Sequence, residues 1–137
     1  MRYDTPDDPE LGGSWVEYSD RWSRAEWRQL AAGRTGETDA EREASGLAWL
    51  ALVAAKTVGL HLLCADGSYL DDPAQLTEAD LDRVEVATYL WWTDTPWALR
   101  TDLANRGNAS RRRLLGTAAG QNQDQATPIA ETATANA

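Results

Sequence analysis

The chain has 137 residues, with 22 acidic and 13 basic side chains, a formal net charge of −9 and a pI near 4.5. This length supplies one hydrophobic core and not two, and the charge argues against general binding to nucleic acid phosphates. The single cysteine, Cys64, excludes an intramolecular disulfide, and with one histidine it cannot make a zinc site without carboxylate ligands.

The N-terminal third begins with a polar leader and continues into a strand and a helix. Residues 1–13 combine prolines, glycines and acidic side chains, which predicts a flexible acidic leader. They lack the basic and then apolar order of a secretory signal, so we expect a cytoplasmic protein. Residues 14–19, SWVEYS, predict a short strand. Ser23 and Glu26 form a capping box that predicts a helix over about 24–32, ended by Gly33.

The longest apolar run, residues 46–65, predicts the central helix of the core. The capping box of Thr38 and Glu41 starts this helix, which we expect to span about 39–58 and to stop near Gly59. The run is long enough to cross a bilayer, but Lys56 lies at its centre, where a charge costs about 2.5–3.5 kcal/mol, so we expect no membrane span. Residues 60–64, LHLLC, either prolong the helix or form a short strand, and the turn at 65–68, ADGS, allows a hairpin.

Two further helices are predicted towards the C-terminus. Thr77 caps the first, over about 78–92, and Thr95 followed by Pro96 starts the second, over about 96–106, which Gly107 and Asn108 end. Residues 109–116 read as a basic turn, and the polar composition of 117–137 predicts a disordered tail. The expected fold class is therefore mainly α. A small helical domain of about four helices, with a short N-terminal strand or hairpin, occupies 14–108 between the flexible leader 1–13 and the segment 109–137.

No group of residues predicts catalysis or metal binding. The densest acidic cluster lacks the ligand spacing of a calcium loop, and helix starts and solvated loops account for its members, Asp71, Asp72, Glu78, Asp80 and Asp82. His61 and Cys64 have the spacing of two ligands on one helix face, but a lone histidine in an apolar run is typical of a hydrogen-bonded core residue. Phosphate-binding glycine loops and nucleophile elbows are absent from the sequence. We therefore expect a protein that is not an enzyme, with no catalytic residue, no cofactor and no metal.

Tryptophan is unusually frequent, with seven Trp, four Tyr and no Phe. These side chains either fill the core or lie at a protein interface, where Trp is enriched. The only basic run in the sequence is Arg111, Arg112 and Arg113, and three interpretations of it are open. It forms a solvated helix end, or it contacts an acidic protein, or it contacts phosphates, which agrees least with the net charge.

Three segments carry a family resemblance. They are GGSWVEYSDRWSRAEWRQL, the apolar LAWLALVAAKTVGLHLL, and ADGSYLDDPAQLTEADLDRV directly after it. Together they resemble the tail assembly chaperones of long-tailed (siphovirus) phages of actinobacteria, over about residues 12–92. The segment WWTDTPW, residues 91–97, departs from this pattern.

The resemblance implies a non-enzymatic role in the cytoplasm of the bacterial host. Such chaperones bind the tape-measure protein and tail-tube subunits and keep the tape measure soluble during tail assembly. The partner-binding residues expected here are Trp91, Trp92, Trp97, Leu103, Arg111, Arg112 and Arg113. Nucleic acid and membrane partners are not expected, and a homo-oligomer is compatible with these features. Two other interpretations stay open: a structural head–tail or minor virion protein, and a small acidic regulatory protein that inhibits a nucleic-acid-binding protein.

Overall fold

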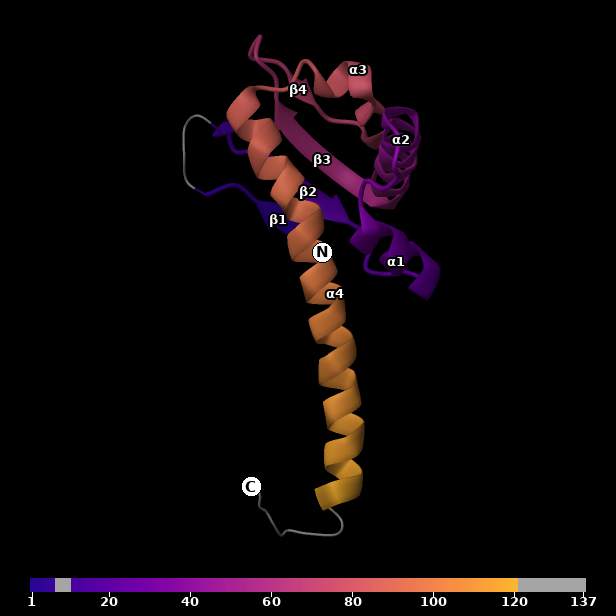
Figure 1. Ribbon diagram of the computed structural model, residues 1–137. Helices are drawn as coiled ribbons and strands as arrows, with labels where there is room; N and C mark the ends of the chain where they lie inside the picture. The colour runs from indigo at the N-terminus through magenta and orange to yellow at the C-terminus, as the bar shows by residue number, and fades with distance from the viewer. Residues whose placement is uncertain (7–10, 121–137) are drawn as a thin grey trace. The chain divides into compact units, whose positions relative to one another are not determined.

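The computed structural model describes residues 1–6 and 11–120, and the chain divides into two units, Met1–Thr101 and Asp102–Ala137. Unit 1 is built around an antiparallel sheet in which the strands follow one another in chain order (Figure 1). The strands are β1 (Arg2–Asp4), β2 (Trp15–Tyr18), β3 (Thr57–Leu63) and β4 (Tyr69–Leu70).

The expected mainly α fold is wrong, because within the described residues four helices combine with this four-stranded sheet in a mixed fold. The helices are α1 (Arg24–Ala32), α2 (Asp39–Lys56), α3 (Glu78–Leu81) and α4 (Val86–Gly120), and a 3₁₀ turn, η2, covers Pro73–Gln75. Two segments account for the difference. Arg2–Asp4, placed in the flexible leader by the sequence analysis, form an edge strand, and Thr57–Leu63 form a seven-residue strand between β2 and β4.

The end of α2 shows why the apolar run is divided between a helix and a strand. The helix ends at Lys56 and not near Gly59, and Thr57 takes an extended conformation as its C-cap. The Thr57 hydroxyl donates to the Val53 carbonyl over 2.7 Å, which satisfies an acceptor in the last turn of α2. From there β3 pairs on both sides, and its buried Leu60 and Leu62 alternate with half-buried residues. Both halves of the run therefore contribute buried side chains to the core, Leu50 and Val53 from α2 and Leu60 and Leu62 from β3.

The capped helices agree with the sequence analysis where local signals define them. The strand expected at 14–19 is confirmed as β2, and the capping boxes at Ser23 and Thr38 start α1 and α2 as predicted. The helix expected over 78–92 is wrong, because α3 is a single turn that ends at Leu81. The segment behind it is tied to β3 by backbone bonds from Ala65 N to Arg83 O and from Glu85 N to Leu63 O. This pairing pulls the chain out of helical geometry before α4 begins.

Helix α4 begins at Val86, and its free N–H groups are capped by the Glu85 carboxylate, which accepts from Ala87 N and Thr88 N over 2.8 and 3.2 Å. It does not end at Gly107 and Asn108 as predicted but continues to Gly120, so the expected basic turn belongs to the same helix. Most of the predicted disordered tail, 121–137, lies outside the described residues.

Pro96 lies inside α4 and does not start a new helix. Proline has no N–H, so the Trp92 carbonyl four residues earlier loses its usual partner. The Thr95 hydroxyl replaces that partner by donating to Trp92 O over 2.7 Å. Because this uses the only hydroxyl hydrogen of Thr95, the Tyr18 hydroxyl, 2.6 Å away, must be the donor in the bond between the two side chains. Strand β2 is thereby connected to α4 at the point where proline removes one backbone hydrogen bond of the helix.

The core of unit 1 lies between the sheet and the first half of α4, which runs across it in Figure 1. Both elements contribute fully buried side chains, among them Val16, Tyr18, Leu60, Leu62, Leu70, Trp92 and Leu99. Burial raises the pKa of the Tyr18 phenol well above its ordinary value. This phenol is therefore neutral in the folded protein and acts only as a hydrogen-bonding group.

Candidate protein-binding surface

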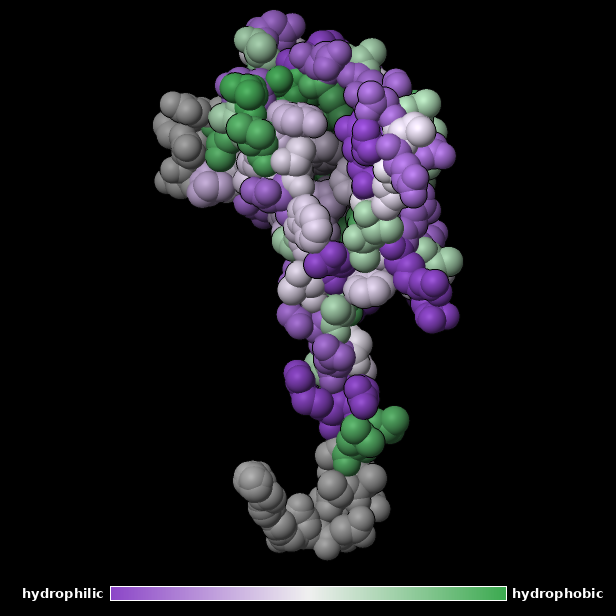
Figure 2. Space-filling model, viewed as in Figure 1, coloured by the Kyte–Doolittle hydropathy of each residue, from purple (hydrophilic) through white to green (hydrophobic). Residues whose placement is uncertain are grey.

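The first half of α4 has a buried inner face and an exposed, apolar outer face. The inner face holds Thr88, Trp92, Thr95 and Leu99, all buried. The outer face holds Val86, Leu90 and Trp97, which are 65%, 59% and 59% exposed. Their spacing of four and seven residues brings them onto one side of a helix with 3.6 residues per turn, and we call them the outer stripe. Hydrophobic residues gather over these first turns of α4 in Figure 2.

Trp97 is the largest member of the outer stripe and lies beside a small hollow between α1, α2 and α4. The hollow has a volume of about 60 Å³ and is lined by Leu30, Gly33, Trp49, Pro96, Trp97 and Arg100. The Arg100 guanidinium lies over the Trp97 ring at 4.3 Å from its centroid, a cation–π contact that orients the indole. An exposed tryptophan at the edge of a hollow has the features of an anchor for a protein partner.

Two other tryptophans hold the walls of this hollow in place. The Trp27 indole N–H donates to the Arg100 carbonyl over 3.3 Å, which connects α1 to α4. The Trp49 indole N–H donates to the Leu30 carbonyl over 3.2 Å, which connects α2 to α1. The surface around Trp97 is therefore built on three connected helices, so a partner would meet it already formed.

The sequence-predicted contact residues have different environments. Trp97 is exposed and Trp91 is half-buried, but Trp92 is only 2% exposed and belongs to the core. Leu103 is half-buried and Arg111–Arg113 are exposed, and these four belong to unit 2. Sequence reasoning missed Val86 and Leu90, because the helix break expected at Pro96 concealed their common face with Trp97.

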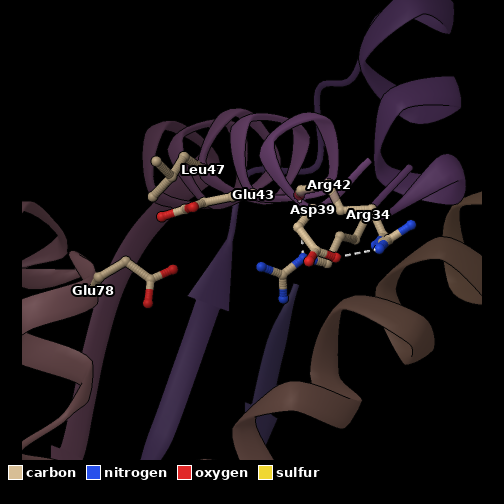
Figure 3. A pocket seen from close by; sticks show the side chains of 6 residues that line it. All are labelled: Arg34, Asp39, Arg42, Glu43, Leu47 and Glu78. Atoms are coloured by element: carbon tan, nitrogen blue, oxygen red, sulfur yellow. Dashed lines mark hydrogen bonds and ion pairs between the residues drawn. The ribbon is translucent and has the colours of Figure 1, made fainter. Parts of the chain in front are cut away.

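A second surface feature is an acidic groove between α2 and α3, with a volume of about 500 Å³ (Figure 3). It is lined by Arg34, Asp39, Arg42, Glu43, Leu47 and Glu78. Arg42 forms an ion pair with Asp39 and donates to two backbone carbonyls of the preceding loop. The Glu43 and Glu78 carboxylates, which point into the space between the two helices, have no ion pair or hydrogen bond within the described part of the chain. Leu47, beside them, is 47% exposed.

The residues weighed for metal or catalytic chemistry have structural partners. His61 stacks on Tyr69, with ring centroids 3.9 Å apart, and its Nδ1 lies 2.6 Å from a carboxylate oxygen of Asp71. Cys64 is buried and lies three residues further along the chain, so it faces the other side of the extended segment. The helix-face spacing considered for this pair therefore does not apply. Within residues 1–6 and 11–120, no group of three potential metal ligands comes together.

Comparison with protein-family models, with curated proteins and with solved structures finds no match to this chain. Among the helices that the structure describes, none combines the length and the apolar character that crossing a bilayer requires. The outer stripe with the hollow beside Trp97 is thus the surface on which a functional proposal can be built.

Proposed function

We propose that this protein is a non-enzymatic tail assembly chaperone of a long-tailed phage, acting in the cytoplasm of the bacterial host on the tape-measure protein and tail-tube subunits. The observation that carries the proposal is the outer stripe, an apolar face on a helix whose opposite face already fills the core. The resemblance of residues 12–92 to these chaperones supplies the identity of the partner.

The physical basis of this proposal is that the chaperone covers apolar surface on its client, the tape-measure protein. Long helices of a tape-measure protein present apolar stripes that aggregate unless another surface covers them. A helix face of Val86, Leu90 and Trp97 can pack against such a stripe in the way that helices pack in grooves. The formal charge of −9 then keeps the complex soluble.

Within this surface, Trp97 is the expected anchor and Val86 and Leu90 are its neighbours. Trp92, which the sequence analysis grouped with Trp97, acts through the core instead, because a side chain that is 2% exposed cannot contact a partner without unfolding. Substitutions in the outer stripe should therefore weaken binding to the tape-measure protein with little loss of folding stability, because these side chains are exposed.

Co-expression with the candidate tape-measure protein tests the proposal. The wild-type chain should raise the soluble fraction of the tape measure and co-purify with it, and the variant Leu90→Ala/Trp97→Ala should lose both effects while keeping its melting temperature. Val58→Ala is the matched control, because Val58 is equally exposed but lies on β3, away from the outer stripe. If the double variant solubilises the tape measure as well as the wild type does, the proposed surface is wrong. Recovery of the protein in mature virions would favour a structural role instead.

A further inference from the structure

Charge is divided unequally between the two units of the chain. Unit 1, Met1–Thr101, has nineteen acidic and nine basic residues, a formal charge of −10. Unit 2, Asp102–Ala137, has three acidic and four basic residues, a formal charge of +1. Its basic residues are all arginines, and three of them are consecutive on α4. The chain thus has an acidic unit and a locally basic helix segment.

The basic segment also carries exposed apolar side chains. Leu114 and Leu115 directly follow the three arginines and are 75% and 56% exposed. Leu115 lies three and four residues after Arg112 and Arg111, so all three share one side of the helix. Arg111 and Arg112 make no ion pair or hydrogen bond with any residue that the structure describes. We call residues 111–115 the basic–apolar end, where Figure 2 shows strongly hydrophilic residues followed by hydrophobic ones along α4.

The acidic groove has the complementary character. Glu78 lines both this groove and an adjoining hollow of about 150 Å³, to which Asp82, Leu81 and Tyr89 also contribute. Glu43, Glu78 and Asp82 therefore place three carboxylates, unpaired among the described residues, next to apolar side chains. Of the two arginines in the groove, Arg42 is paired with Asp39, whereas Arg34 bonds through its Nε to the Arg42 carbonyl over 3.2 Å and keeps its charge. The residues that line the groove therefore have a formal charge of −1.

We propose that copies of this chain associate head to tail, with the basic–apolar end of one copy bound in the acidic groove of the next. Arg111 and Arg112 meet Glu43 and Glu78, and the leucines cover the exposed Leu47. Because the two surfaces differ, the contact is heterologous. A pair of copies therefore still has one free groove and one free basic–apolar end, to which further copies can bind. This self-association does not depend on the chaperone function, since no residue of the outer stripe takes part.

Sedimentation velocity of the full-length chain tests the proposal. The weight-average mass of the wild type should rise between about 10 μM and about 1 mM protein, and the rise should disappear when salt is raised from about 0.05 M to about 0.5 M. The variants Arg111→Glu/Arg112→Glu and Glu43→Lys/Glu78→Lys should each weaken association by about tenfold or more. An equimolar mixture of the two variants should associate again, because each then supplies the charge that the other has lost.

Matched controls separate this contact from net charge. Arg24→Glu/Arg28→Glu and Glu37→Lys/Asp94→Lys make the same changes in charge at exposed positions outside the groove and the basic–apolar end, and circular dichroism checks that every variant folds. A wild type that stays monomeric at all concentrations overturns the proposal. Association that persists in Glu43→Lys/Glu78→Lys also overturns it, because the contact would then lie between the α4 helices of two copies. Failure of the two variants to associate when mixed overturns it as well.

Discussion

Replacing Thr95 by valine tests the connection between β2 and α4 most directly. The Thr95 hydroxyl donates to the carbonyl that Pro96 leaves without a partner, and it accepts from Tyr18. Valine keeps the shape of the side chain but removes both bonds, in a position that is 4% exposed. Each buried polar group left unsatisfied costs about 1–3 kcal/mol. Thr95→Val should therefore lower the free energy of unfolding by about 2–6 kcal/mol, from the Trp92 carbonyl and the Tyr18 hydroxyl together.

Urea unfolding followed by tryptophan fluorescence measures this loss of stability. Two additional substitutions, Tyr18→Phe and Pro96→Ala, separate the contribution of the Tyr18 bond from that of the Trp92 carbonyl bond. Tyr18→Phe alone should cost about 0.5–1.5 kcal/mol, and less when Thr95 is already valine, because the phenol then has no partner left to lose. Pro96→Ala restores a backbone N–H towards the Trp92 carbonyl, so Thr95→Val should cost about 1 kcal/mol less in that background. A cost below about 0.5 kcal/mol for Thr95→Val in the wild-type chain, or an equal cost with proline and with alanine at position 96, would refute the reasoning.

Three further outcomes follow from the core and its caps. In the folded state the pKa of the Tyr18 phenol is raised above its ordinary value of 10.0. The stability that this phenol contributes is therefore full below about pH 10 and is lost as the pH rises further. Alkaline unfolding should show this loss in the wild-type chain, and the Tyr18→Phe variant should not show it. Trp92→Ala should destabilise by about 3–5 kcal/mol in urea, whereas Trp97→Ala should stay within about 0.5 kcal/mol. Ser23→Ala removes the capping box of α1 and should cost about 1 kcal/mol, measured as a lower urea midpoint, and Arg24→Ala should cost far less.

Local signals predicted those parts of the fold whose causes are local. The capping boxes at Ser23 and Thr38 start α1 and α2, because their hydrogen bonds join side chains to backbone N–H groups only three residues away. These bonds do not depend on partners elsewhere in the chain. Gly33 ends α1 in a positive-φ conformation for a similar reason. The turn at 65–68 joins β3 and β4, with Gly67 at positive φ.

The strands depended on partners that no local pattern reveals. Thr57–Leu63 follows a helix within one apolar run, and only its pairing with both β2 and β4 makes it a strand. Arg2–Asp4 looks like part of a polar leader, yet its backbone pairs with Trp15–Glu17. Long-range pairing of this kind outweighs weak local propensity, which is why a mainly α interpretation failed.

The candidate surface was predicted only in part, for a related reason. Proline after threonine is a typical helix start, but the Thr95 hydroxyl supplies the missing bond and the helix continues. With a helix break at position 96, Trp97 and Leu90 have no common face; with a continuous helix they do. The core position of Trp92 could not be distinguished from the exposed position of Trp97 by composition, because both are tryptophans in one short segment.

The continuity of α4 through Pro96 also connects folding to binding. One helix presents its inner face to the sheet and its outer stripe to solvent, so the Thr95 bonds that hold the inner face also fix the orientation of the stripe. A partner that binds Val86, Leu90 and Trp97 therefore binds a helix already fixed by the core and loses little conformational entropy in doing so. Thr95→Val in a chain that is still folded should then weaken client binding through loss of this orientation, although Thr95 itself is buried and cannot touch the client.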